Sequence, residues 1–375
     1  MNFNILEQTI AFALKGSRAY GLETENSDYD YTGIFIPPRE YFFGFTKHIE
    51  QCESIEPYKK FYKEKVDISK KNEGCVYELR KFLKLASNCN PNVIEILWVE
   101  PEDFFIRKPE FEKIHEIRDL FLSKKARFTF SGYAFSQIKR CATHRSFILS
   151  PPTRKPTRGD YNLPEICSSQ YEAAEALIRK EIEHWAFHDL DLSLEVADAI
   201  REKIKEQLAY TLATLNLNLS TDILDESYIR KAAMNKIGFD DNMFMILEKE
   251  HVYRKELDNF KNYEIWKKTR NPERAKLEEK YHYDSKNALH VVRLLRMGEE
   301  ILSQGKVIVK RPDREELLAI RNGAWTYEQL LEYAENMQKK LDRLYKTSSL
   351  RKAPDVEKIE KVCIELVENS IFRKV

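Results

Sequence analysis

The chain has 375 residues, of which 42% are hydrophobic and 33% are charged, a composition typical of a globular protein long enough for two domains. Its 62 lysines and arginines balance 61 aspartates and glutamates, so the net charge of +1 excludes a strongly basic nucleic-acid binder, and any contact with RNA or DNA must be local. No apolar run approaches the roughly 20 residues that span a bilayer, and six scattered cysteines without zinc spacing favour a reduced, cytoplasmic compartment.

The first predicted element is a buried strand over the apolar run 10–14, which ends at a Gly-Ser turn. Gly16 lets the backbone approach a ligand closely, and the N–H groups of the turn, together with the Ser17 hydroxyl, can hold phosphate oxygens. Arg18 follows directly and is a second candidate contact for a triphosphate.

The next strand-like run, residues 29–36, follows a pair of aspartates separated by one tyrosine. Because side chains alternate along a strand, Asp28 and Asp30 are expected on one face, with Tyr29 and Tyr31 on the other. Two adjacent carboxylates repel each other unless a cation lies between them, and Mg²⁺ takes carboxylate and phosphate oxygens together. The pair is therefore a candidate metal clamp for a nucleoside triphosphate. The alternative is an ordinary turn, because Asn, Ser and Asp are common turn residues.

The order of a Gly-Ser turn, a D-x-D pair and a buried strand resembles the polymerase-β-type nucleotidyltransferase superfamily. The resemblance implies a third carboxylate on a later strand, for which Asp67 in the run 64–68 is the candidate and Glu64 the rival. Such an acid could coordinate the second metal ion and accept the proton of the acceptor hydroxyl. Alternatively, Asp67 is an ordinary charge at the edge of a strand.

Blocks further along the chain are similar to a family of predicted nucleotidyltransferases associated with RNA repair, which has bacterial and phage members. These blocks are residues 77–83, 90–98, 132–133 with 137, 290–298 and 320–323. Membership implies a nucleotidyltransferase fold and metal-dependent transfer of a nucleotidyl group, with Mg²⁺ or Mn²⁺ as the cofactor and a nucleoside triphosphate (NTP) as the donor. It does not imply an acceptor.

The organisation of the chain changes near residue 120. The first third has a mixed character, because it contains strand-like runs and a predicted helix over residues 74–87. Over residues 165–346, by contrast, the apolar residues recur almost everywhere at helical spacing. We therefore expect an α+β protein. A nucleotidyltransferase catalytic domain is predicted over residues 1–120, and a mainly helical domain over residues 121–375 is predicted to complete the cleft for nucleotide and acceptor.

The helix predicted over residues 285–304 carries a basic stripe and is followed by Gly305, a typical helix stop. Lys286, His290 and Arg293 share one face, opposite an apolar face. Apolar residues on both flanks of the stripe, together with the family resemblance, favour a cleft-lining face that binds a triphosphate or an acceptor phosphate. An exposed, solvated helix face is the alternative.

Two classes of function remain open. In the first, the chain is a metal-dependent nucleotidyltransferase: Gly16 and Ser17 hold the triphosphate, Asp28, Asp30 and Asp67 bind the metal, and Asp67 also serves as the base. In the second, the chain is a non-catalytic protein that binds nucleotides or RNA ends. The three acids favour the enzyme, because unneutralised like charges cost stability. The acceptor stays open among an RNA end (tRNA or broken RNA), a protein hydroxyl that is adenylylated, and a small molecule.

Overall fold

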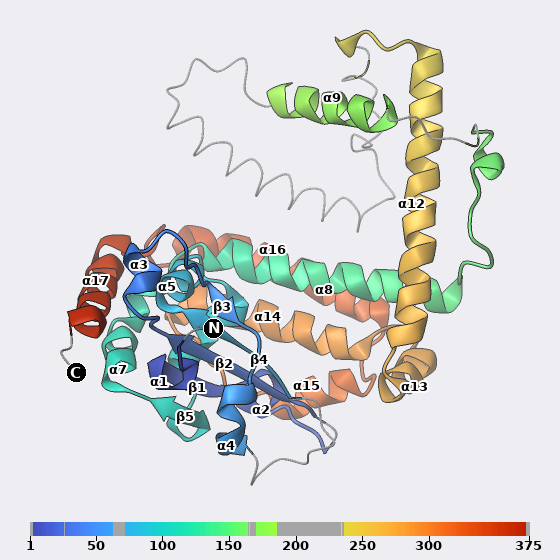
Figure 1. Cartoon of the computed structure of the whole chain (residues 1–375). Helices are drawn as coiled ribbons and strands as arrows, with labels where there is room; N and C mark the ends of the chain where they lie inside the picture. Colours follow the sequence, from blue (N-terminus) through green and yellow to red (C-terminus); the bar gives the residue numbers. More distant parts are fainter. Residues whose placement is uncertain are drawn as a thin grey trace. The chain divides into compact units, whose positions relative to one another are not determined.

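The computed structural model describes residues 3–25, 27–62, 72–163, 165, 170–185, 234 and 236–372. The described chain is of the predicted α+β class, with a five-stranded sheet near the N-terminus and a mainly helical remainder (Figure 1). Contacts divide the chain into two compact units. The first unit combines residues 1–140 with 285–375, and the second unit is residues 141–284.

The sheet of the first unit has the strand order β3-β4-β2-β1-β5. Its strands are β1 (Thr9–Lys15), β2 (Tyr29–Phe35), β3 (Gln51–Cys52), β4 (Asn72–Glu78) and β5 (Phe104–Arg107). β1 is antiparallel to both β2 and β5, β2 is parallel to β4, and β3 is antiparallel to β4. The strands predicted from the apolar runs 10–14 and 29–36 are confirmed as β1 and β2. The run 64–68 lies outside the described residues.

Short helices connect the strands of the first unit. They are α1 (Ile5–Gln8), α2 (Gly16–Ala19), α3 (Glu40–Phe43), α4 (Lys59–Tyr62), α5 (Leu79–Ser87), α6 (Pro91–Ile94) and α7 (Pro109–Glu116), with 3-10 turns at Glu56–Tyr58, Glu95–Trp98, Pro101–Asp103 and Arg118–Phe121. The predicted helix 74–87 is wrong in its first part, because residues 74–78 belong to β4 and the helix begins at Leu79. The Glu78 carboxylate accepts the backbone N–H of Lys81 and caps α5, which fixes the change from strand to helix.

Aromatic side chains form the core on one face of this sheet. The Phe12 ring of β1 stacks on Tyr58 with their centroids 4.1 Å apart and on Tyr31 of β2 at 5.3 Å. The hydroxyls of Thr9 and Tyr58 share a buried hydrogen bond of 2.7 Å. Because this face is filled by aromatic rings, polar side chains that do chemistry must lie on the other face or at the strand ends.

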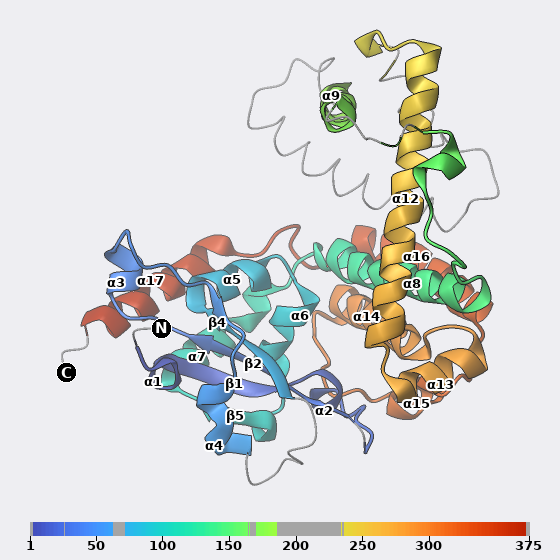
Figure 2. The same cartoon turned by 45° about the vertical axis from the view of Figure 1, so that its right-hand side comes forward.

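Helices from the C-terminal third pack in the same unit as the sheet. They are α14 (Ser285–Gln304), α15 (Arg314–Arg321), α16 (Tyr327–Thr347) and α17 (Val356–Phe372). The predicted limits of α14 are confirmed. α14 contacts α15 and α16, whereas α17 contacts α5 and α7 (Figure 2). The compact units therefore differ from a division at residue 120, because the apolar faces of α14 to α17 are buried within the first unit rather than in a separate domain.

The second unit is helical in its described part. α8 (Ala126–Leu149) runs into it, and it contains a 3-10 turn at Arg158–Tyr161 together with α9 (Gln170–Trp185), α12 (Asp241–Thr269) and α13 (Pro272–Tyr281). Arg158 donates two hydrogen bonds, of 2.9 and 2.7 Å, to the carboxylate of Glu250 in α12. None of the helices in the described ranges is both long and apolar enough to cross a membrane.

Candidate active site

The Gly-Ser turn follows β1 and lies directly against Asp30. Gly16 has a φ of +67°, a left-handed conformation that favours glycine. A Cβ atom at this position would also collide with the Asp30 carboxylate. The Ser17 carbonyl accepts the N–H of Leu22 at 2.7 Å, which closes the turn after α2. Residue 16 is therefore restricted to glycine both by its backbone conformation and by the acid beside it.

The two aspartates of the D-x-D pair differ in exposure. Asp28 is exposed and immediately precedes β2, whereas Asp30 is half-buried within β2, opposite Lys15 of β1 in the strand register. The rings of Tyr29 and Tyr31 stack with centroids 6.5 Å apart, so both lie on one face of β2. Because side chains alternate, the Asp30 carboxylate points to the opposite face, away from the aromatic core.

Burial and neighbouring charges act in opposite directions on the Asp30 carboxyl. Burial raises the pKa of the Asp30 carboxyl; the charges of Lys15 and Lys286 lower this pKa, and those of Asp28 and Glu73 raise it. Burial also lowers the pKa of the Lys15 ammonium, although Asp30 counteracts this effect. The net direction for Asp30 is upward, because burial, the largest cause, outweighs the charges of the two lysines. A divalent cation beside Asp28 and Asp30 would offset this cost of burying the carboxylate.

Glu73 is a third acid that the sequence analysis missed. It lies in β4, where it is the register partner of Asp30 in the parallel pair of β2 and β4. Register partners on neighbouring strands have side chains on the same face, so the two carboxylates adjoin. Asp67 and Glu64 lie outside the described residues, and the role of Asp67 stays a prediction. The sequence feature that could have identified Glu73 is an acid at the start of a short strand-like run that leads directly into a helix.

The turn and two of these acids line one cavity of about 690 Å³. Its lining residues come from β1, β2, β3 and β4 and the chain next to them: Lys15, Gly16, Asp30, Tyr31, Gln51, Glu53, Glu73, Gly74, Cys75 and Tyr77. The cavity is mixed in charge, because the Lys15 ammonium faces three carboxylates. Its size suits a ligand of nucleotide dimensions.

Arg18 is bound to the loop that carries the aspartates. Its Nη2 donates to the Ser27 carbonyl at 3.0 Å, its Nε donates to the Asp28 carbonyl at 3.3 Å, and its guanidinium lies 3.5 Å from the centroid of the Tyr29 ring. These contacts position the backbone of Asp28 relative to α2. The predicted contact of Arg18 with a triphosphate stays a prediction.

The predicted basic stripe of α14 is divided between two environments. Lys286 is exposed, and its charge lowers the pKa of Asp30, so the first turn of α14 lies close to the acids. His290 is half-buried one turn further along α14. Their predicted contact with phosphates stays a prediction.

Arg293 lies in the core instead of on an open face. It is 6% exposed, its Nη1 donates to Glu95 Oε1 at 2.9 Å, and its guanidinium lies 3.9 Å from the centroid of the Tyr20 ring. The Tyr20 hydroxyl donates to the other oxygen of Glu95. We therefore correct the prediction that Arg293 lines the cleft, because its charge is engaged in a buried ion pair that ties α14 to the 3-10 turn Glu95–Trp98 after α6.

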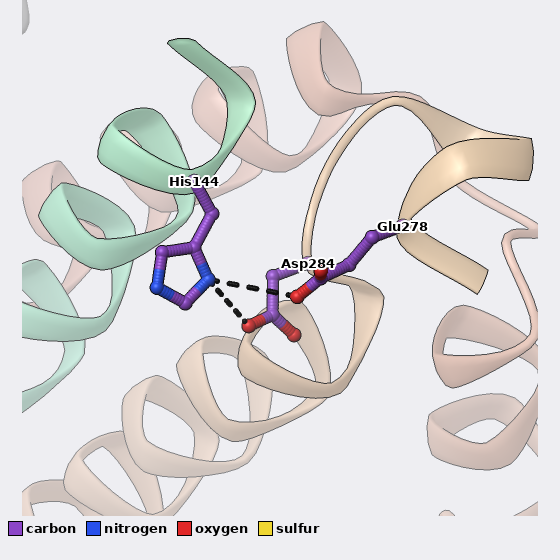
Figure 3. A group of neighbouring side chains, drawn as sticks. All are labelled: His144, Glu278 and Asp284. Atoms are coloured by element: carbon purple, nitrogen blue, oxygen red, sulfur yellow. Dashed lines mark hydrogen bonds and ion pairs between the residues drawn. The ribbon is translucent and has the colours of Figure 1, made fainter. Parts of the chain in front are cut away.

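A second cluster of polar side chains lies in the second unit. His144 Nδ1 is 3.2 Å from Asp284 Oδ2 and 3.5 Å from Glu278 Oε1, and the three side chains converge from α8, α13 and the chain before α14 (Figure 3). This set could hold a metal ion. However, Arg274 pairs with the same two carboxylate oxygens, and Arg270 donates to Glu278 Oε2 at 2.8 Å. The two guanidinium groups balance the two carboxylates, so the cluster is a buried ion-pair network.

The network makes the stability of the second unit depend on pH. Burial lowers the pKa of His144, but the hydrogen bonds that its ring donates to Asp284 and Glu278, together with the charges of these acids, outweigh burial and raise this pKa above its usual 6.5. A raised pKa in the folded state means that protonation stabilises the fold below about pH 6.5, and that this contribution is lost as the pH rises through the folded-state pKa. We expect His144→Gln to lower the melting temperature at about pH 5.5 and to have a much smaller effect at about pH 9. Thermal unfolding followed by circular dichroism measures the difference, and a pH-independent difference would contradict the assignment.

The chain is similar to known proteins over part of its length. Residues 6–148 match the model of the RNA repair pathway DNA polymerase beta family. The chain is 35% identical over 89 residues to the uncharacterized protein YcgL of Bacillus subtilis, which covers 24% of this chain and 30% of that protein. It is 30% identical over 96 residues to an uncharacterized 38.9 kDa protein of Enterobacteria phage T4, which covers 25% of this chain and 27% of that protein. The chain thus matches less than a third of the length of these curated relatives, and no solved structure matches it.

The matched region contains the Gly-Ser turn, the D-x-D pair and β4. The match therefore agrees with the resemblance inferred from the turn and the paired aspartates. Residues 6–148 of this chain are thus similar to the RNA repair pathway DNA polymerase beta family.

Proposed function

We propose that this chain is a metal-dependent nucleotidyltransferase that moves a nucleoside monophosphate from an NTP to a hydroxyl group at an RNA end. The observation that carries the proposal is the placement of three acids at one site: Asp30 is the register partner of Glu73, stands two residues after Asp28 and lies against the Gly16 turn. Acids whose mutual repulsion is only partly offset are costly unless a cation joins them. The match of residues 6–148 to the RNA repair pathway DNA polymerase beta family supports the same class of reaction.

The acids fit a hard divalent cation. Asp28, Asp30 and Glu73 offer only oxygen ligands, which Mg²⁺ and Mn²⁺ prefer, and the cavity beside Asp30 and Glu73 leaves space for phosphate oxygens that complete the coordination. When bound, the metal would polarise the phosphates and offset the charge that develops on the leaving group.

The transfer breaks a phosphoanhydride bond of the NTP and forms a phosphate ester bond to the acceptor. The acceptor hydroxyl oxygen attacks the α-phosphorus of the NTP, the bond between the α-phosphorus and the bridging oxygen breaks, and pyrophosphate leaves with that oxygen. A carboxylate of the acid set takes the proton of the acceptor hydroxyl. The backbone at Gly16 and Ser17 binds the triphosphate, and the charges of Lys15 and Lys286 offset the phosphate charge beside Asp30.

Glu73 and Asp67 are the rival bases, and their amide variants separate them. We expect Glu73→Gln to lower the rate of the chemical step by about 10²- to 10⁴-fold with little change in NTP affinity, because a base acts in the transition state. Asp67→Asn is the matched comparison, since it removes the same charge from the residue that the sequence alone favoured. Single-turnover rates decide between the two. A normal rate for Glu73→Gln with a strong loss for Asp67→Asn would return the role to Asp67.

The acceptor class can be tested directly. The purified chain is incubated with each labelled NTP, Mg²⁺ or Mn²⁺, and a pool of RNA, DNA and protein acceptors, and the label is then located by gel electrophoresis. Label on RNA ends is the expected result. Label on protein would move the function to protein adenylylation. Nucleotide binding without transfer under every condition would contradict the proposal and support a non-catalytic nucleotide-binding protein.

A further inference from the structure

A second hollow of the first unit lies between the segment that follows α3 and the outer side of α5. Its volume is about 700 Å³, and we call it the α3–α5 groove; it is lined by, among others, Phe42, Phe45, Lys47, Lys81 and Lys84. Its described lining residues are distinct from those of the active-site cavity. Aromatic and cationic side chains therefore share one concave surface.

Two exposed phenylalanines lie in this groove or next to it. Phe45, which lines the groove, is 101% exposed, and Phe43, which stands beside the lining residues at the end of α3, is 69% exposed. A third ring, that of Phe42, is covered by the guanidinium of Arg80, which lies 4.4 Å from the ring centroid. Large apolar rings gathered at one place on the surface mark a binding site more often than chance exposure does. The flat faces of Phe43 and Phe45 can stack on planar ligands.

Positive charge exceeds negative charge along the groove. Its cationic lining residues are Lys47, Arg80, Lys81 and Lys84, and its acidic ones are Glu50 and Glu78. The hydrogen bond from Lys81 holds the pKa of Glu50 below its usual range, and the charges of His48 and Lys84 act in the same direction. Several cations therefore surround one exposed carboxylate. Exposed ion pairs of this kind contribute little to stability, so a phosphate can replace Glu50 at low cost.

The groove adjoins the active-site cavity along the edge of the sheet. Glu50 and Glu78 line the groove, whereas their chain neighbours Gln51 and Tyr77, which are register partners in β3 and β4, line the active-site cavity. Glu73 lines the active-site cavity and Glu78 lines the groove, and the two lie about 17 Å apart along β4 at the usual rise of an extended strand. A flexible polymer whose end lies at the acids can reach the groove within a few nucleotides.

We propose that the α3–α5 groove binds a single-stranded stretch of the acceptor RNA, with bases stacked on Phe43 and Phe45 and phosphates bound by Lys81 and Lys84. The choice of RNA as the acceptor rests on the proposed function. The chemistry of the groove favours a single strand, because stacking on aromatic side chains needs bases that are not paired in a duplex. The excess of lysine and arginine matches the charge of the phosphate backbone.

Binding of a fluorescein-labelled single-stranded oligouridine, followed by fluorescence anisotropy without NTP or metal, tests the proposal. We expect Phe43→Ala with Phe45→Ala to weaken binding about 5- to 150-fold for each stacked base that is lost. Lys84→Gln is expected to make the log–log dependence of affinity on salt shallower by about 0.7, the value for one phosphate contact with a single strand. The control variant Ile246→Ala with Lys249→Gln changes an exposed apolar residue and an exposed lysine on α12, and it should bind like the parent.

Two results would overturn the groove assignment. In the first, the phenylalanine variant binds oligouridine like the parent at every salt concentration, as expected if Phe43 and Phe45 dock a protein instead. In the second, the control variant loses as much affinity as the groove variants. Thermal unfolding excludes a folding defect, because Phe45 is fully exposed and its truncation removes little buried area. A chain that binds oligouridine through the groove but transfers no nucleotide would overturn only the proposed function.

Discussion

Asp28→Asn and Asp30→Asn are each expected to abolish nucleotidyl transfer while leaving the chain folded. Each substitution removes one charge with almost no change in volume, so the loss falls on metal binding. A metal clamp supplies several kcal/mol of charge stabilisation in the transition state, which corresponds to a loss of about 10³-fold or more in rate. Transfer of labelled NTP under single-turnover conditions measures the effect.

The same variants have a stability readout. The raised pKa of Asp30 means that its charge destabilises the metal-free fold above the unfolded-state value of 3.8, and that this penalty disappears as the pH falls below 3.8. Asp30→Asn should therefore raise the melting temperature of the metal-free protein at neutral pH and lose this advantage in acid. It should also abolish the rise in melting temperature that Mg²⁺ gives the parent.

Asp119→Asn is a suitable control for both readouts, since Asp119 is exposed and lies outside the active-site cavity. We expect parental transfer and a parental response to Mg²⁺ from this variant. Persistent transfer by Asp30→Asn, or an unfolded Asp30→Asn protein, would remove the basis of the metal assignment.

The sequence predicted the elements that depend on local patterns. The apolar run 10–14 was sufficient for β1, and the stop at Gly305 was sufficient for the end of α14, because burial and capping act over a few neighbouring residues. The turn at Gly16 and the pair Asp28 and Asp30 were also recognised, since they lie close together in the chain. The structure adds their mutual contact, which follows from the antiparallel pairing of β1 and β2.

Glu73 was missed because the segment just before Leu79 fits the residue spacing of a helix as well as that of a strand. Val76 stands three positions before Leu79, so it extends the helical pattern of α5 backwards, although it is in fact buried within β4. The parallel pairing with β2 decides between strand and helix, and it joins residues far apart in the chain. Without that pairing, the register that brings Glu73 beside Asp30 has no local signature.

Arg293 was misassigned because a helical projection assumes one buried face. α14 is buried on most of its circumference, and the side of α14 that carries Arg293 meets Glu95, which lies 198 positions away in the chain. In the sequence alone, a polar residue on a buried side of such a helix looks the same as a polar residue on an exposed side. Only its ion-pair partner distinguishes the two. The ion pair with Glu95 is therefore visible only in the tertiary structure.

Arg293→Met is expected to lower the free energy of unfolding by about 3–5 kcal/mol, because it leaves the Glu95 carboxylate buried without its counter-charge. Adding Glu95→Gln should recover part of this loss, since the amide keeps a hydrogen-bond acceptor for the Tyr20 hydroxyl and removes the unpaired charge.

Lys286→Gln on the same helix is the contrasting variant. Lys286 is exposed, so stability should stay within about 0.5 kcal/mol of the parent while NTP affinity falls. Urea unfolding and NTP titration of the three variants separate the two roles. If Arg293→Met unfolded like the parent but bound NTP weakly, Arg293 would be a triphosphate ligand after all, and α14 would contribute its whole basic stripe to the cleft.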